Sequence, residues 1–157
     1  MKNWRLLAGA VLGVAIIAAA LATQQPNKPQ QAVPRCGEYR TDKVVTIGSE
    51  KIKAEVVETV AEQEKGLSGR PCIEPDRGML FVHQKPGRYP IWMKDMKFPI
   101  DIVWINRDRQ IIGYDFNVEP STYPDSFVSE KPAQYILELQ ANRAKNLDIK
   151  LGTPVNF

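Results

Sequence analysis

Short apolar runs separated by turn-forming residues dominate the sequence from residue 43 to its end. Several runs alternate apolar and polar residues, which is the period of a β-strand with one buried face. The few helical segments are too short for the crossover connections that a parallel sheet needs. The pattern predicts a mainly β domain, an antiparallel β-sandwich or a barrel-like fold, with one or two short helices. The expected strands are residues 43–47, 51–58, 79–83, 91–93, 100–105, 111–114, 133–139 and 155–157.

The first expected helix begins at a capping box. Thr59 is followed three positions later by Glu62, and this pair satisfies two free backbone N–H groups at a helix N-terminus. We expect the helix over about residues 60–67, with a glycine, Gly66 or Gly69, at its C-terminal cap. Residues 142–147 are the second candidate for a helical turn.

The N-terminal segment has the pattern of an export signal. Lys2 and Arg5 precede an uncharged apolar run at residues 6–22. Two interpretations remain open: residues 1–22 are a cleaved signal peptide, or they are an uncleaved transmembrane anchor. Both place the rest of the chain outside the cytoplasm, either secreted, periplasmic or anchored and facing outward. Residues 23–34 are a Gln/Pro-rich linker, and residues 35–157 are expected to form a single globular domain.

The charge balance argues against one class of partner. The chain has a net charge of +3, and two of its 21 basic residues lie in the leader with no acidic residue. The remainder therefore has 19 basic and 18 acidic residues, a net charge of +1. A near-neutral domain gives no electrostatic reason to expect a nucleic-acid partner. Neither a Gly-rich phosphate loop nor a zinc-ligand spacing is present in the sequence, so we expect no cofactor.

The chain has two cysteines, Cys36 and Cys72. Outside the cytoplasm they can form one intramolecular disulfide, which would connect the start of the domain to the loop after Gly69. The alternative is a pair of free thiols. We favour the disulfide, which would stabilise the domain by roughly 3–4 kcal/mol in the chain-entropy model.

Five motifs occur in one order along the domain, and together they resemble a known family. They are GLSGR at residues 66–70, GMLFV at 78–82, WMKDM at 92–96, FPIDIVWI at 98–105 and YILEL at 135–139. The order and the motifs are similar to those of the bacterial and archaeal family catalogued as domain of unknown function 192. The resemblance implies a compact β-rich fold, often behind a signal peptide, and no agreed activity. Family members often have a glycine after the LE strand, where this chain has Ala141-Asn142.

Two carboxylates lie inside otherwise apolar strands. Asp101 shares a strand face with Val103 and Ile105, and Glu138 lies beside Ile136. A buried carboxylate is costly unless it is paired, and Arg70 and Lys94 are the natural partners.

These charges have two interpretations. They are structural ion pairs, or they form a shallow cleft that binds a small polar ligand, with Trp92 available for stacking. The second interpretation predicts a non-enzymatic binding module for a small polar or carbohydrate-like ligand or for an envelope protein. Its ligand-binding residues would be Arg70, Trp92, Lys94, Asp101 and Glu138.

Two further hypotheses use the same stretch of chain. A cell-envelope hydrolase would use Asp101 and Glu138 as its paired acids. A copper-handling protein would use Met93, Met96 and His83, because thioethers and imidazole suit copper. His83 is the only histidine, so a Ser-His-Asp or Cys-His set would have to include it. Whether the domain is an enzyme stays open, and the sequence favours a domain without catalytic activity.

Overall fold

The computed structural model describes residues 36–157. The expected leader and linker, residues 1–22 and 23–34, lie outside this range, and their assignment stays a prediction. Within the described range, none of the helices has the length and apolarity that a membrane crossing requires.

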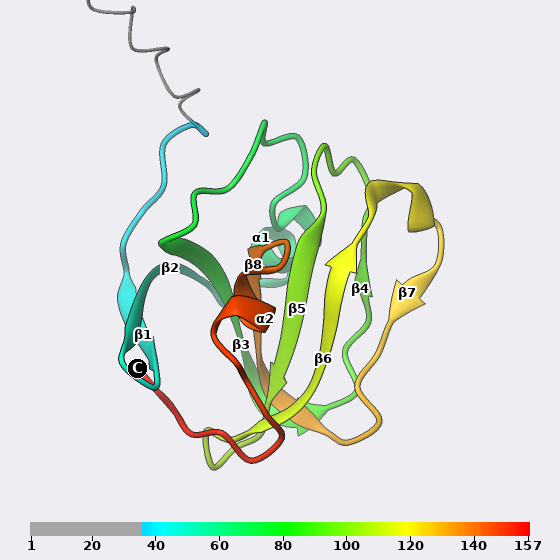
Figure 1. Cartoon of the computed structure of the whole chain (residues 1–157). Helices are drawn as coiled ribbons and strands as arrows, with labels where there is room; N and C mark the ends of the chain where they lie inside the picture. The colour runs from blue at the N-terminus through cyan, green and yellow to red at the C-terminus, as the bar shows by residue number, and fades with distance from the viewer. Residues whose placement is uncertain (1–35) are drawn as a thin grey trace, which may run out of the picture. The chain divides into compact units, whose positions relative to one another are not determined.

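The core of the domain is one curled seven-stranded sheet in the form of a half-barrel (Figure 1). Its strands follow the order β6-β5-β8-β3-β2-β1-β9, and β4 pairs with β7 in a separate small sheet. The strands are β1 (Lys43–Ile47), β2 (Glu50–Val57), β3 (Arg77–Gly87), β4 (Ile91–Trp92), β5 (Ile100–Ile105), β6 (Ile111–Val118), β7 (Ser126–Phe127), β8 (Ala133–Gln140) and β9 (Val155–Asn156). Two short α-helices, α1 (Val60–Lys65) and α2 (Arg143–Asn146), and a 3-10 turn, η1 (Pro120–Thr122), complete the fold. The mainly β, barrel-like class is therefore confirmed.

One strand pair departs from the antiparallel arrangement that the sequence predicted. β2 and β3 run parallel, with Glu55 opposite Met79, so the sheet is mixed. The connection between them contains α1 and the turns that follow it. This segment is long enough to return the chain to the same end of the sheet, which a parallel pair requires. The sequence analysis predicted no parallel pair because the helices are short. The structure has one, since α1 together with the turns after it makes a long enough crossover.

Helix α1 begins as predicted. The Thr59 hydroxyl accepts a hydrogen bond from the Glu62 N–H, and the Glu62 carboxylate accepts one from the Thr59 N–H. The helix ends at Gly66, whose φ of 45° lies in the region that favours glycine. The capping box and the glycine cap are both confirmed.

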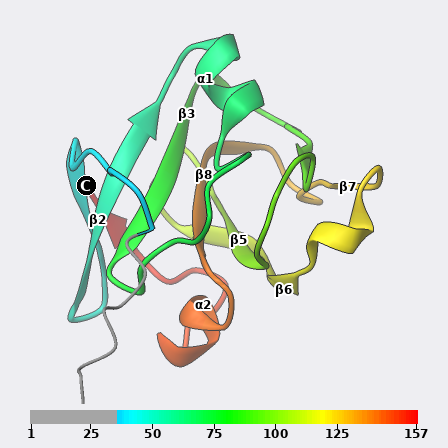
Figure 2. The ribbon, with the colours of Figure 1, turned by 90° about the horizontal axis from the view of Figure 1, so that it is seen from above.

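Apolar residues cover both faces of the sheet, and α1 and α2 lie on opposite sides of it (Figure 2). The α2-side core contains Val103, Leu137 and Ala144 among others. The α1-side core contains Ile102, Trp104 and Ile136, as the alternation within β5 predicted for the first two. All six residues of β5 are buried, because each face of this strand meets a core.

A disulfide joins Cys36 to Cys72 across a sequence separation of 36, with the two Cα atoms 4.8 Å apart. It connects the segment before β1 to the crossover between β2 and β3. Next to it, the Tyr39 hydroxyl donates a hydrogen bond to the backbone carbonyl of Cys72. The disulfide pairing expected from the sequence is therefore present in the structure.

Replacing both cysteines by serine should lower the free energy of unfolding by about 3 kcal/mol, because the unfolded chain gains the entropy of an open loop of that length. Urea unfolding followed by circular dichroism measures the change. Treatment of the native protein with a reductant should give a similar loss and have no effect on the double variant. Equal stability of the native protein with and without reductant would show that the disulfide does not stabilise the domain.

Candidate ligand-binding pocket

Asp101 has a fully satisfied structural environment. Its side chain is buried, and its carboxylate accepts hydrogen bonds from three backbone N–H groups. The donors are Asn117 at 2.8 Å, Asn142 at 2.9 Å and Ala144 at 2.8 Å. One carboxylate thus connects β5 to the end of β6 and to the start of α2. Neither Arg70 nor Lys94 pairs with it, since backbone amides fill that role.

The same contact involves an unusual backbone conformation at Asn142. Asn142 has a φ of 66°, a conformation in which glycine is easiest and asparagine is the best-tolerated alternative. The conformation directs the Asn142 N–H to Asp101. Asparagine therefore fits this turn.

Arg70 has a different partner from the one expected. Its guanidinium donates two hydrogen bonds, at 2.8 and 2.9 Å, to the carboxylate of Glu55. It also lies over the Tyr39 ring, 4.3 Å from the ring centre. Glu55 is buried, and the sequence analysis missed it. The available signal was that Glu55 shares a strand face with the apolar Val57, which indicates that this face becomes buried.

Glu138 lies on the opposite face of the sheet from Asp101. In the pairing of β5 with β8, Asp101 is opposite Leu139, while Glu138 is opposite Ile102. Leu139 belongs to the α2-side core and Ile102 to the α1-side core. Because the two carboxyl groups face different layers, they cannot act on one bond. The hydrolase hypothesis based on this pair is therefore excluded.

The environment of Glu138 is unlike that of Asp101. Its side chain is only 5% exposed, and within residues 36–157 no hydrogen-bond partner reaches its buried Oε2 atom. Burial raises the pKa of this carboxyl to about 8, and the nearby Arg70 charge opposes the rise only in part. Glu138 is therefore largely protonated at neutral pH.

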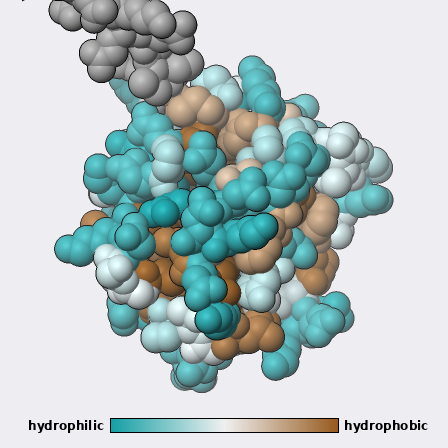
Figure 3. All heavy atoms as spheres, viewed as in Figure 1, coloured by the Kyte–Doolittle hydropathy of each residue, from teal (hydrophilic) through white to brown (hydrophobic). Residues whose placement is uncertain are grey.

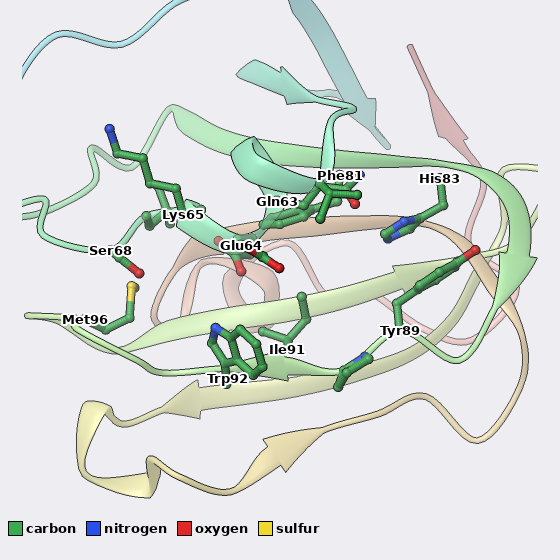
Figure 4. Close-up of a pocket in the computed structure, with 15 residues that line it drawn as sticks. Gln63, Glu64, Lys65, Ser68, Phe81, His83, Tyr89, Ile91, Trp92 and Met96 are labelled. Carbon is green, nitrogen blue, oxygen red and sulfur yellow. The ribbon is translucent and has the colours of Figure 1, made fainter.

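Glu138 forms part of a pocket of about 280 Å³ on the α1 side of the sheet. Its walls come from α1 and the turn after it, from β3, and from the segment that contains β4 (Figure 4). The lining residues are Val60, Gln63, Glu64, Lys65, Gly66, Leu67, Ser68, Phe81, His83, Tyr89, Pro90, Ile91, Trp92, Met96 and Glu138. Most of them are apolar or aromatic, with a few polar groups, which is the usual composition of a small-molecule site.

A stacked pair forms one end of the pocket. The His83 and Tyr89 rings are 3.5 Å apart and nearly parallel, at 9° (Figure 4). Burial lowers the pKa of His83, so the ring is neutral at neutral pH. Its Nε2 atom is buried and has no hydrogen-bond partner among the described residues. Gly87 makes room for this pair, because a Cβ there would lie 2.9 Å from the Tyr89 ring.

The turns of two family motifs form the other end. The Ser68 hydroxyl donates a hydrogen bond to the Lys94 carbonyl at 2.7 Å, and the Gly69 N–H donates one to the Asp95 carbonyl at 2.9 Å. Gly69 has a φ of 77°, which requires glycine. Lys94 takes part through its backbone, and its side chain is exposed. Trp92, 43% exposed, lies in the pocket wall (Figure 4).

The structure separates the residues of the copper hypothesis. Met93 is buried in the α1-side core. Met96 lies beside Ser68, while His83 lies beside Tyr89 at the far end (Figure 4). Among residues 36–157, no group of three or more His, Cys, Asp and Glu side chains is placed to hold a metal ion. Of the five expected ligand-binding residues, the pocket includes Trp92 and Glu138 and leaves out Arg70, Lys94 and Asp101.

The half-barrel with this pocket defines a class of β-rich domain that has solved relatives. A protein of unknown function from Novosphingobium aromaticivorans superposes with a TM-score of 0.69 at 29% identity, covering 73% of this chain and 84% of that one. A protein from Sinorhizobium meliloti, described as a putative transcription regulator, gives a TM-score of 0.69 at 28% identity, covering 76% and 97%. No curated protein matches the chain.

The family model of domain of unknown function 192, described as "Uncharacterized ACR", matches residues 43–157. The chain belongs to this family. The match covers every strand and helix of the half-barrel, so the resemblance noted from the five motifs is confirmed.

Replacing Asp101 by alanine should lower the free energy of unfolding by about 3–5 kcal/mol, because three buried N–H groups lose their acceptor. Urea unfolding at pH 7 measures the loss. The matched control is Asp125→Ala, which removes an exposed carboxylate and should change stability by less than about 0.5 kcal/mol. A loss below about 1 kcal/mol for Asp101→Ala would contradict the structural role.

The stability contributed by Glu138 should depend on pH. Its folded pKa of about 8 lies above the ordinary value of 4.5, so the unfolded chain ionises first as pH rises. The contribution of Glu138 to the free energy of unfolding therefore falls as the pH rises from about 4.5 to about 8. Relative to the native protein, Glu138→Gln should become more stable across this range, by on the order of 3–5 kcal/mol.

Urea unfolding of both proteins at several pH values between 4.5 and 8 provides the measurement. Glu130→Gln is the matched control, since Glu130 is exposed and lies outside the pocket. A difference between Glu138→Gln and the native protein that stays constant with pH would show that Glu138 titrates normally.

Proposed function

We propose that the domain is a non-enzymatic binding module that takes a small, carbohydrate-like ligand in the pocket between α1 and β4. The observation that carries the proposal is an aromatic-lined pocket whose lining includes two buried polar atoms with no hydrogen-bond partner among residues 36–157. Trp92 offers an exposed ring for stacking. Within the described part of the chain, Glu138 and His83 each have a buried polar atom without a partner, and buried polar atoms usually have one.

The size of the pocket limits the ligand. Its volume of about 280 Å³ lies just below the range for small-molecule sites, roughly 300–1,000 Å³. One or two rings fit in such a space, and a longer chain would have to leave through the open side. A single sugar, or the end of a saccharide chain, meets this limit.

The proposed location is outside the cytoplasm, with residues 1–22 as the signal peptide or the anchor. The Cys36–Cys72 disulfide supports this location, because disulfides persist mainly in oxidising compartments. The Sinorhizobium meliloti relative is described as a putative transcription regulator. The net charge of +1 over the region after the leader does not favour the same role here. On the face that carries α2, hydrophilic and apolar residues are intermixed (Figure 3).

Saccharide binding should depend on Trp92. A thermal-shift screen of the full chain against mono- and disaccharides of the cell envelope should give a rise in Tm with at least one of them. Trp92→Ala should weaken that binding about fivefold to thirtyfold, since stacking on one aromatic ring contributes on the order of 1–2 kcal/mol.

The control is Phe116→Ala, which removes a partly exposed aromatic ring outside the pocket and should leave binding unchanged. Equal losses from the two variants, or no response to any saccharide, would contradict the proposed site.

A further inference from the structure

On the α1 side of the sheet, two carboxyl groups lie close to one cation. Glu55, Met79 and Glu138 are neighbours across β2, β3 and β8. Arg70 is the cation next to this row, and its guanidinium donates two hydrogen bonds to Glu55. One carboxyl group, Glu138, therefore has no cation of its own.

No other cation in the pocket is placed to fill this gap. Lys65 is exposed, and its amino group points away from Trp92 and Tyr89 (Figure 4). His83 is neutral and lies four residues beyond Met79 on β3, which is about 13 Å along the strand from the Glu138 position. The remaining ionisable side chains of the lining, Glu64 and Tyr89, are an acid and a phenol.

The walls around this carboxyl suit a cation. Phe81, Tyr89 and Trp92 line the pocket, and the faces of aromatic rings carry partial negative charge that attracts an ammonium group. A buried carboxylate together with aromatic faces is the combination that recognises organic cations. A ligand carboxylate or phosphate would find no such partner, because it cannot stabilise the ionised form of Glu138 and the nearby Arg70 is already paired with Glu55.

We propose that the ligand of this pocket carries an ammonium group next to a ring, that the ammonium group pairs with Glu138, and that the ring stacks on Trp92. An amino sugar is the carbohydrate form of such a ligand, so the inference deepens the proposed function and rests on it. The free carboxyl holds its proton, and the arriving ammonium group stabilises the ionised form. Binding at neutral pH therefore releases the Glu138 proton to the solvent.

Isothermal titration of the full chain at pH 7 tests the proposal with two matched sets of probes. The sugars are glucosamine, glucose and N-acetylglucosamine, and the simple rings are cyclohexylamine and cyclohexanol. In each set the free amine should bind at least about tenfold more tightly than its neutral counterparts. Repeating the titration in buffers of different ionisation enthalpy should show about one proton released for each amine bound.

Glu138→Gln keeps the shape of the side chain and removes its charge, so the preference for amines and the proton release should both disappear. Glu130→Gln, the exposed control, should retain both. Retained preference and release in Glu138→Gln would overturn the assignment of the ammonium site.

The remaining outcomes separate the inference from the proposed function. Sugars that bind without any preference for the amine would overturn the inference and leave the binding module intact. Preference for cyclohexylamine with no binding of any sugar would support the ammonium site and overturn the carbohydrate-like ligand. No binding by any probe would overturn both.

Discussion

The carboxylate of Asp101 is the contact on which the rest of the half-barrel depends. It is buried in the α2-side core and accepts hydrogen bonds from the N–H groups of Asn117, Asn142 and Ala144. Asn117 lies 16 residues after Asp101 in the sequence, and Asn142 and Ala144 lie 41 and 43 residues after it. A charge at this position is tolerated because the backbone surrounds it, and its hydrogen bonds set the positions of β6 and α2 relative to β5.

Glu138 is a buried carboxyl group on the other face of the sheet, and unlike Asp101 it is not surrounded by hydrogen-bond donors from residues 36–157. It is as deeply buried as a core residue, yet its Oε2 atom has no partner in the described part of the chain. Such an arrangement is unfavourable for stability, and it is usually retained where a ligand completes it. Asp101 thus supports the fold, while Glu138 lines a pocket whose aromatic walls suit a small ring.

The sequence predicted much of the fold and less of the site. Alternation within β5 and the capping box at Thr59 are local signals, and both were read correctly. The parallel pairing of β2 with β3 depends on where the crossover returns the chain, which no local pattern contains. The same limit applied to Arg70, because its partner Glu55 lies 15 residues away on a strand whose buried face was not recognised. Trp92 and Glu138 were expected in the site, and the pocket contains both.

The most direct test of this account is the pKa of Glu138, measured by nuclear magnetic resonance of its side-chain carboxyl carbon. The account predicts a pKa of about 8 in the free protein, and a fall of more than one pH unit when glucosamine is bound. A value near 4.5 in the free protein would show that Glu138 is solvated or already paired. It would remove the physical basis of the proposed ammonium site.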